Sequence, residues 1–415
     1  MRIRRCAVVW IEPREDASFQ LQDLFSGGTG VVGRLGWRAH APHLAAPVEI
    51  EAASVALLGA LGPVDWVERA PLDTLHGPDV VARLLEAGLL LAREQAHPAV
   101  QADADFRAQG WHAGAALAHH ASRWRGVDAG ADPQGALVRR GDAPPHFRPA
   151  QESVMPLPQV AADGFDALLD ARATCRNYDL DAWVPLDAFS QLLARVFGAR
   201  GLLQHGDGLT VVKRTSPSGG ALHPGECLLV VQRVEGIAPG LYRYRMDGHA
   251  LEAVVPRAQP PQPGDTATRP LDADASTPWN PEALRAFARI AVAGQDWFAD
   301  APVLCVLASR FPRNYWKYRN HAKAYRVTVL DIGHLSQTLQ LCATQAGLAP
   351  FITAAINEVD IERAFGLAGF AESPLAVCGF GVRADTMATV EFDPNHKVWP
   401  GCSPPGPSTP LRSEP

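Results

Sequence analysis

One segment, residues 325–347, limits the folds open to this chain more than any other. It reads YRVTVLDIGHLSQTLQLCATQAG and places apolar residues at helical spacing on more than one face. A helix of that kind needs cover on most of its surface, so we expect it to be buried. Apolar runs typical of strands lie at 227–234, 240–245, 303–309 and 375–382. Further helices are predicted at 164–172, 186–199 and 281–291. This pattern predicts an α+β fold with a mixed sheet flanked by helices.

The length of the chain predicts more than one domain. At 415 residues it exceeds a single ordinary core, and 47% apolar with 20% charged residues is usual for a folded protein. Residues 1–125 form the first region. After a predicted strand at 6–12, helical spacing at 51–61, a short helix, a helix from 80–87 and the strand LLLARE follow the winged-helix order. We therefore expect an N-terminal winged-helix-like α/β extension.

The charge of this extension argues against a nucleic-acid partner. Arg83 is nearly alone near its second helix, and the whole chain carries a net charge of -6. Docking of a peptide at a strand edge is one interpretation. A packing domain without any ligand is an equally good one.

The composition changes at two further points. Residues 126–164 are rich in Gly, Ala, Pro and Asp, which predicts a linker or extended arm, and residues 165–398 form the second domain. Within it, 256–278 has the composition of a surface loop, and a disordered tail is expected at 399–415.

The seven cysteines are an odd number and form no CxxC pair. Free buried thiols in a reducing compartment are the best interpretation. The N-terminal apolar run is too short for a signal peptide, and no run approaches the about 18 apolar residues of a membrane span. We therefore expect a cytoplasmic protein without membrane contact. His112 and His119 lack a third metal ligand, and His334 reads as a hydrogen-bonded core histidine.

The stretch ARATCRNYD at 171–179 is the first candidate for chemistry. Arg172 and Arg176 lie about one helical turn apart, with Thr174 between them. Two guanidinium groups and a hydroxyl suit a phosphate monoester, because arginine donates forked, charge-assisted hydrogen bonds. Two surface arginines at a helix end are the alternative.

The stretch KRTSPSGGALHPGE at 213–226 is the second candidate. It lacks the spacing of a P-loop, and no strand clearly precedes its glycines. The turn of Pro217, Ser218, Gly219 and Gly220 has little side-chain bulk, so its backbone could approach a flat ligand closely. A plain turn that leads into a strand is the alternative.

The third candidate is the basic stretch before the long helix. Lys317 and Tyr318 lie here among further basic residues and tyrosines. Cationic neighbours could lower the pKa of a lysine enough for it to act as a base. A solvated basic helix start is the alternative.

Together and in this order, these stretches resemble the flavin-dependent nitroreductase superfamily, and within it the SagB-type dehydrogenases that mature ribosomally made peptides. RATCRNY, PSGGALHPGE, GLYRY at 240–244, Gln295 before the strand APVLCV, and the Lys-Tyr pair with YRVTVLDIGHLSQ carry the resemblance. It covers about residues 165–385 and implies a nitroreductase-like fold. Ala173, Thr174 and Thr338 depart from the usual basic residue, serine and asparagine.

The resemblance implies FMN bound at a homodimer interface. No metal is expected, because His112 and His119 lack a third ligand. Arg172, Thr174 and Arg176, with Arg383, would hold the phosphate. Residues 217–220 would lie along the isoalloxazine ring with Gln295 nearby, and Lys317 and Tyr318 would be catalytic.

We therefore expect an FMN-dependent dehydrogenase that oxidises a precursor peptide, for example from azoline to azole or by Cα–Cβ desaturation. Other peptide-modifying enzymes are expected partners. A NAD(P)H-dependent nitroreductase or quinone reductase is one alternative. A flavin-inert, peptide-binding scaffold of a modification complex is another.

Overall fold

The computed structural model describes residues 1–94, 97–130, 144–145, 147–148, 155–158, 160–206, 208–254 and 279–401. The chain forms two compact units. One comprises Met1–Ser122 with Tyr315–Tyr325, and the other comprises Arg123–Asn314 with Arg326–Pro415. The predicted loop at 256–278, much of the predicted linker and the tail beyond residue 401 lie outside the described residues.

The N-terminal unit is built on a small antiparallel sheet. Strand β1 (Arg2–Arg5) lies between β5 (Val67–Glu68) and β6 (Leu90–Ala92). Helices α2 (Ala52–Ala60), α3 (Arg69–His76) and α4 (Pro78–Glu86) pack on it around Ile3, Leu57, Val81 and Leu90. Helices α2, α3 and α4 and strand β6 correspond, in this order, to the three helices and the strand LLLARE that we predicted. Strand β5 lies between α2 and α3. The strand predicted at 6–12 is wrong, because β1 ends at Arg5 and the next strand begins at Trp10.

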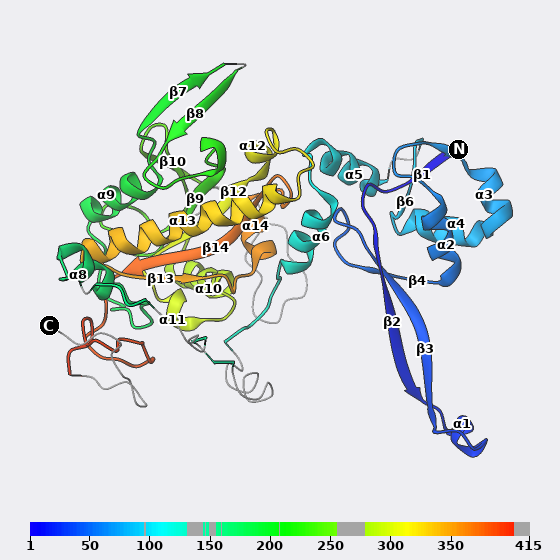
Figure 1. The fold of residues 1–415 in the computed structure, drawn as a ribbon, viewed down its shortest axis with the longest axis horizontal. Helices are drawn as coiled ribbons and strands as arrows, with labels where there is room; N and C mark the ends of the chain where they lie inside the picture. Colours follow the sequence, from blue (N-terminus) through cyan, green and yellow to red (C-terminus); the bar gives the residue numbers. More distant parts are fainter. Residues whose placement is uncertain are drawn as a thin grey trace. The chain divides into compact units, whose positions relative to one another are not determined.

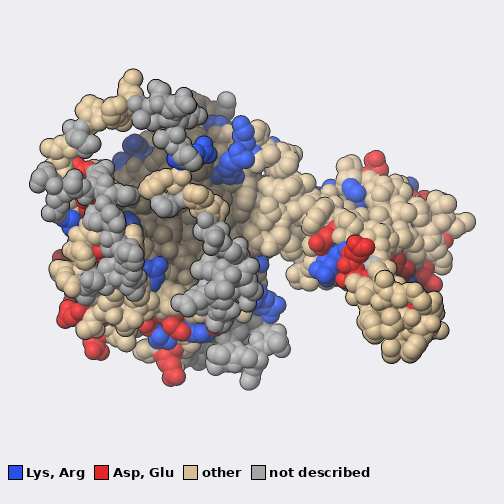
Figure 2. All heavy atoms as spheres, turned by 60° about the horizontal axis from the view of Figure 1, so that its bottom comes forward, with Lys and Arg blue, Asp and Glu red and all other residues tan. Residues whose placement is uncertain are grey.

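A long hairpin extends from this unit. Strands β2 (Trp10–Phe19) and β3 (Val31–His40) pair over their whole length, β4 (Val48–Ile50) pairs with β3, and α1 (Leu21–Phe25) closes the tip (Figure 1). Few charged side chains appear at that tip (Figure 2). Helices α5 (Pro98–Ala108) and α6 (Ala113–Ser122) complete the unit.

The second unit contains a six-stranded sheet in the order β11-β10-β9-β12-β14-β13. The strands are β9 (Gly225–Val231), β10 (Gly240–Arg245), β11 (Ala250–Ala253), β12 (Val303–Arg310), β13 (Ala349–Thr353) and β14 (Glu372–Gly381). Every neighbouring pair is antiparallel, so the prediction of a mixed sheet is wrong in this respect. The α+β class and the flanking helices are confirmed.

Helices cover both faces of this sheet (Figure 1). Alternate residues of the apolar strands point to opposite faces, so the runs in β9 and β12 are buried on both sides. Leu228, Val230 and Leu304 meet α10 (Pro281–Ala291), α11 (Asp296–Ala299) and α14 (Glu358–Phe365). Leu229, Val231 and Val303 meet α9 (Leu186–Phe197) and α13 (Lys323–Gln345).

Helix α13 is the long segment that we expected to be buried. Ile332, Leu335 and Leu339 face the sheet and are at most 4% exposed. Val329 and Leu330 are 45% and 56% exposed, so the expectation holds for one face and is wrong for the other. The sheet of a single chain covers only one side of the helix.

Three short elements frame the candidate site. Helix α8 (Gly164–Ala171) starts with a capping box between Asp163 and Asp166 and ends at Arg172. The hairpin β7 (Gly201–His205) and β8 (Leu209–Lys213) leads into a turn of 3-10 helix at Gly219–Ala221. Helix α12 (Phe311–Tyr315) follows β12.

Chain entry into the second unit is fixed by hydrogen bonds to α14. The N–H groups of Trp124, Gly126 and Val127 donate to Glu358, Asp360 and Asn357. The start of the predicted linker is therefore attached to a helix.

Two sequence-based expectations concern the whole chain. The six described cysteines are free thiols, five of them buried. None of the helices in the described part of the chain has the length and apolar character needed to cross a bilayer.

Candidate functional site

The Arg172–Tyr178 motif lies beside strand β13. The N–H of Cys175 donates to the carbonyl of Pro350 at 2.8 Å, and the Tyr178 hydroxyl donates to that of Ala349 at 3.2 Å. Cys175 and Tyr178 are buried, while Arg172, Thr174 and Arg176 are half-buried. The backbone thus fixes the motif, and its polar side chains stay near the surface.

The two arginines of this motif have no acidic partner among the described residues. Arg172 donates to the amide oxygen of Gln340 on α13 at 3.4 Å. The guanidinium of Arg176 lies 5.9 Å from the centre of the Phe298 ring, a distance at which a cation and an aromatic face attract. Two guanidinium groups without a counter-charge, with the hydroxyl of Thr174 between them in sequence, can hold a doubly charged anion.

Arg383 has a different environment. It forms an ion pair with Glu391, whose side chain is fully buried. Glu391 also accepts hydrogen bonds from the N–H groups of Arg176 and Asn177, the Asn177 amide and the indole of Trp399. The charge of Arg383 is therefore already compensated within the chain. Sequence reasoning missed Asn177 and Glu391.

The turn at Pro217–Gly220 forms a ledge fixed to α13. The Ser218 hydroxyl donates to Asp331 Oδ2 at 2.6 Å, and the Gly219 N–H donates to Asp331 Oδ1 at 3.1 Å. A Cβ at Gly219 would overlap the side chain of Val327, so only glycine allows this close approach. Gly220 has a φ of 67°, which also favours glycine.

Asp331 is the residue that sequence reasoning missed here. Burial raises the pKa of its carboxyl, and the hydrogen bonds from Ser218 and Gly219 partly oppose that rise. Its signal in the sequence is that it is the one acidic residue of α13.

Two sequence-based statements about this region need correction. Strand β8 directly precedes the glycine turn, although no strand was expected there. The conclusion that the spacing of this stretch does not match a P-loop is unchanged. His334 is exposed rather than in the core, and its Nδ1 lies 3.3 Å from the Pro217 carbonyl. His223 is 8% exposed, and burial together with the charge of Arg214 lowers its pKa to about 4. It is therefore neutral at neutral pH.

Gln295 fixes the turn that follows β13. Its amide nitrogen lies 3.1 Å from the Thr353 hydroxyl and 3.0 Å from the Ala355 carbonyl. Phe298, which lies beneath Arg176, stacks on Phe351 of β13 at 4.1 Å. The structure thus gathers Arg172, Arg176 and Gln295 around β13.

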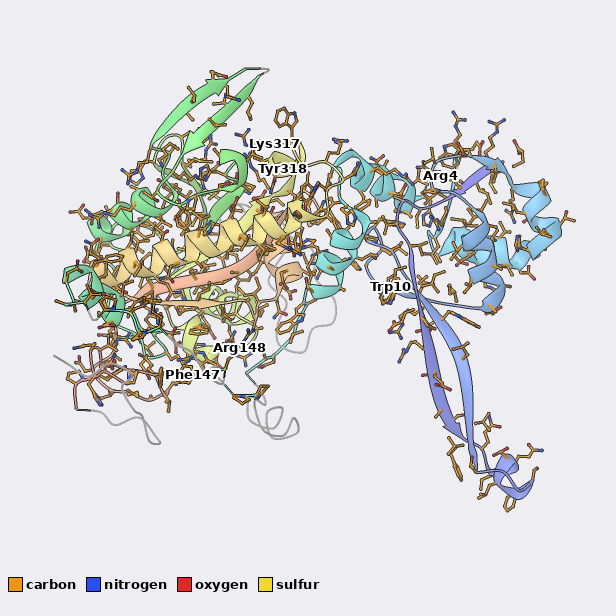
Figure 3. All side chains as sticks on the ribbon, in the orientation of Figure 1. Arg4, Trp10, Phe147, Arg148, Lys317 and Tyr318 are labelled. Atoms are coloured by element: carbon orange, nitrogen blue, oxygen red, sulfur yellow. The ribbon has the colours of Figure 1, made fainter. Side chains whose placement is uncertain are left out.

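Lys317 and Tyr318 lie in the segment before α13 (Figure 3) that packs with the N-terminal unit. Lys317 is exposed, and its Nζ lies 5.5 Å from the centre of the Tyr318 ring. The Asn320 N–H donates to the Gly110 carbonyl at 2.8 Å, and Arg319 donates to that of Ala108 at 3.3 Å. The loop between α5 and α6 therefore holds this segment.

Within the described ranges, no group of three or more His, Cys, Asp or Glu side chains could hold a metal ion. The polar groups of the site are instead guanidinium, hydroxyl, amide and backbone N–H groups. These suit an organic anion with a flat ring.

Comparison with known proteins gives relatives for part of the chain. It is 28% identical over 166 residues to the trifolitoxin-processing protein TfxB of Rhizobium leguminosarum bv. trifolii, covering 40% of this chain and 38% of TfxB. It is 25% identical over 148 residues to the nitroreductase MJ1384 of Methanocaldococcus jannaschii, covering 36% and 61% of the two chains. The chain thus spans less than two thirds of both relatives.

One solved structure with a similar fold is the E. coli microcin synthetase McbBCD complex with truncated pro-MccB17 bound. The identity is 21% and the TM-score 0.46, over 64% of this chain and 91% of that chain. Residues 169–382, just over half of the chain, match the nitroreductase family. They include the arginine motif, the ledge, Gln295 and α13, and the chain therefore belongs to the nitroreductase family.

Proposed function

We propose that this chain is an FMN-dependent dehydrogenase that removes two hydrogen atoms from a ribosomally made peptide. The observation that carries the proposal is the pair Arg172 and Arg176, two cations without an acidic partner in the described chain. A phosphate monoester carries close to two negative charges at neutral pH, which matches this pair. Membership in the nitroreductase family supports a flavin as the source of that phosphate.

The residues present fit FMN. Arg172, Thr174 and Arg176 would hold its phosphate, and Arg383 would contribute less because Glu391 already neutralises it. Residues 217–220 offer a ledge without side-chain bulk, fixed by Asp331, along which a flat ring can lie. Gln295 would support the site from the turn after β13. The bound flavin supplies a hydride acceptor.

Lys317 is the proposed base, with Tyr318 beside it. Removing two hydrogens needs a group that takes one as a proton, and a lysine does so best when its ammonium form is destabilised. The exposure of Lys317 implies that bound substrate has to supply that low-dielectric surrounding.

A peptide substrate is supported by two observations. TfxB, a relative over part of the chain, is named for the processing of trifolitoxin. The N-terminal unit presents a three-stranded sheet with short edge strands, β5 and β6, at which an extended peptide could add a strand. Other peptide-modifying enzymes are proposed as partners on the same ground.

A homodimer is also part of the proposal. Val329 and Leu330 leave an apolar face of α13 exposed in the single chain, and a second copy would cover it. Sedimentation of the purified protein, with a Leu330→Lys variant as comparison, measures the oligomeric state. A monomeric parent protein would remove this part of the proposal.

The test of the proposed function is co-expression with a short precursor peptide encoded beside the gene. The expected results are a yellow, FMN-containing protein and a peptide whose mass is lower by two hydrogen atoms. A colourless protein that does not bind added FMN would contradict the cofactor. Rapid flavin reduction by NADPH without peptide would favour a nitroreductase or quinone reductase. Peptide binding without any mass change would favour a scaffold.

A further inference from the structure

A cavity lies in the second unit, at the strands that follow the ledge. It has a volume of about 520 Å³, within the range of about 300–1,000 Å³ typical of small-molecule sites. Strands β9, β10 and β12 contribute most of its lining, and one wall is apolar. That wall consists of Phe197, Cys227, Tyr244 and Met246.

Charged side chains line the rest of the cavity, and nearly all of them are paired. The ion pairs are Glu226 with Arg243 and Arg310, Glu372 with Arg243, and Asp247 with Arg245. Four arginines and three carboxylates therefore line the cavity, and Arg245 also pairs with Glu252, which lies outside the lining.

Arg214 is the cation without a carboxylate partner. It is 2% exposed, and it donates to the carbonyl of Gly225 at 2.8 Å and to the sulfur of Met246. Its Nε is buried and has no hydrogen-bond partner. A buried charge normally has an ionic partner, because transfer out of water is costly, and a thioether is a weak acceptor. Burial accordingly lowers the pKa of the Arg214 guanidinium.

The lining also selects the kind of anion. Glu226 and Glu372 would repel a doubly charged phosphate, whereas a single negative charge could pair with Arg214, the lining arginine without a carboxylate partner. The apolar wall adds room for a hydrocarbon or aromatic group beside that charge. The chemistry that fits is therefore a carboxylate on a short apolar chain.

We propose that this cavity is a binding site for a monocarboxylate with an apolar group, which Arg214, the lining arginine without a carboxylate partner, recognises through its guanidinium group. The carboxylate could belong to a small free acid or to the C-terminus of a peptide that ends in an apolar residue. Its lining includes no residue of the arginine motif at Arg172–Tyr178, and the proposal does not rest on FMN binding or on peptide oxidation.

Isothermal titration of the whole chain tests the proposal with hydrocinnamate as the free acid. The peptide arm uses a short peptide ending in phenylalanine with a free carboxylate. Each probe has a neutral control of the same size, hydrocinnamamide and the C-terminally amidated peptide. We expect at least one carboxylate to bind about tenfold or more tightly than its amide, the effect of one charge-assisted hydrogen bond. The arm that binds identifies the source of the carboxylate.

Two variants locate the site. Arg214→Gln should weaken carboxylate binding by about tenfold or more, whereas Arg245→Gln, which removes a paired and exposed arginine of the same lining, should change it little. If Arg214→Gln does not fold, crystals of the parent protein soaked in hydrocinnamate give the second measurement. A carboxylate within hydrogen-bonding distance of Arg214 would support the site. Equal binding of acid and amide in both arms, or a soaked cavity without the acid, would overturn it.

Discussion

The Arg172–Tyr178 motif and the Lys317–Tyr318 pair are both short polar stretches, but different parts of the molecule hold them. The first is bonded to β13 through Cys175 and to the buried Glu391 through its backbone, within the second unit. The second belongs to a segment bonded to the loop between α5 and α6 of the N-terminal unit.

This difference separates the proposed cofactor site from the proposed base. The proposed phosphate site depends on bonds within the nitroreductase domain and should tolerate changes in the N-terminal unit. The proposed base depends on a segment that the N-terminal unit supports. Substitutions should therefore fall into two classes, those that change FMN affinity and those that change turnover alone.

The largest effect is expected for Lys317→Ala. Turnover of the peptide should fall by about 10²–10⁴-fold, the usual contribution of a positioned base, while bound FMN stays unchanged. The flavin absorbance and the rate of peptide oxidation are measured on the same sample. Lys323→Ala changes another exposed lysine of the same segment and serves as the control. Unaltered turnover in Lys317→Ala would refute the assignment of the base.

The second prediction concerns the two kinds of arginine. Arg176→Gln should weaken FMN binding by about 10–100-fold, because a hydrogen bond to a charged group contributes about 1.5–3 kcal/mol. Arg383→Gln should instead lower the free energy of unfolding, because it leaves the carboxylate of Glu391 buried without its cation. Fluorescence titration with FMN and urea unfolding separate the two effects. Equal losses of FMN affinity would show that Glu391 does not neutralise Arg383.

Gly110→Ala tests whether the loop between α5 and α6 supports the proposed base. Gly110 has a φ of +73°, and a Cβ there would lie 2.9 Å from Cγ of Arg319. Strain of about 1 kcal/mol should lower turnover by about fivefold and leave FMN affinity unchanged. Gly62→Ala is the control, since a Cβ at Gly62 meets nothing within 4 Å. A loss of FMN affinity in Gly110→Ala would show that FMN binding is not independent of the segment that carries Lys317.

Sequence patterns predicted the helices and strands in which buried apolar residues recur at regular spacing. Helix α10 and strand β10 have the predicted bounds, 281–291 and 240–245. In both, the spacing of the apolar residues places them on the side that is buried. The hairpin of β2 and β3 was missed because most of β2 is exposed, so burial imposes no alternation on its sequence.

The candidate site was predictable only in part. The arginine motif, the ledge and Gln295 came from ordered short motifs, which the structure gathers around β13 and α13. Glu391 could not be found this way, because its exposed neighbours Val390 and Phe392 are apolar and the pattern predicts the opposite orientation. Its partners at 176, 177 and 383 are distant or polar, so only the tertiary structure identifies it.

The smallest effect is expected for Asp331→Asn, which tests how the ledge is held. An asparagine can still accept from the Gly219 N–H and can donate to the Ser218 hydroxyl, so FMN affinity should change by only about 0.5 kcal/mol, the lower end for a neutral hydrogen bond. The pH dependence should change more clearly. The pKa of Asp331 is raised in the folded state, so the folded chain keeps this proton at a pH where the unfolded chain has lost it.

The parent protein therefore loses stability as pH rises from the unfolded pKa of aspartate, about 3.9, through the raised folded value. Asp331→Asn has no such proton to lose, so its unfolding free energy relative to the parent should increase over that pH range. Urea unfolding of both proteins at several pH values measures the difference. A difference that stays constant, or that falls as pH rises, would mean that the pKa of this carboxyl is not raised in the folded state. In that case hydrogen bonds from Ser218 and Gly219 would have to stabilise the ionised form more than burial opposes it.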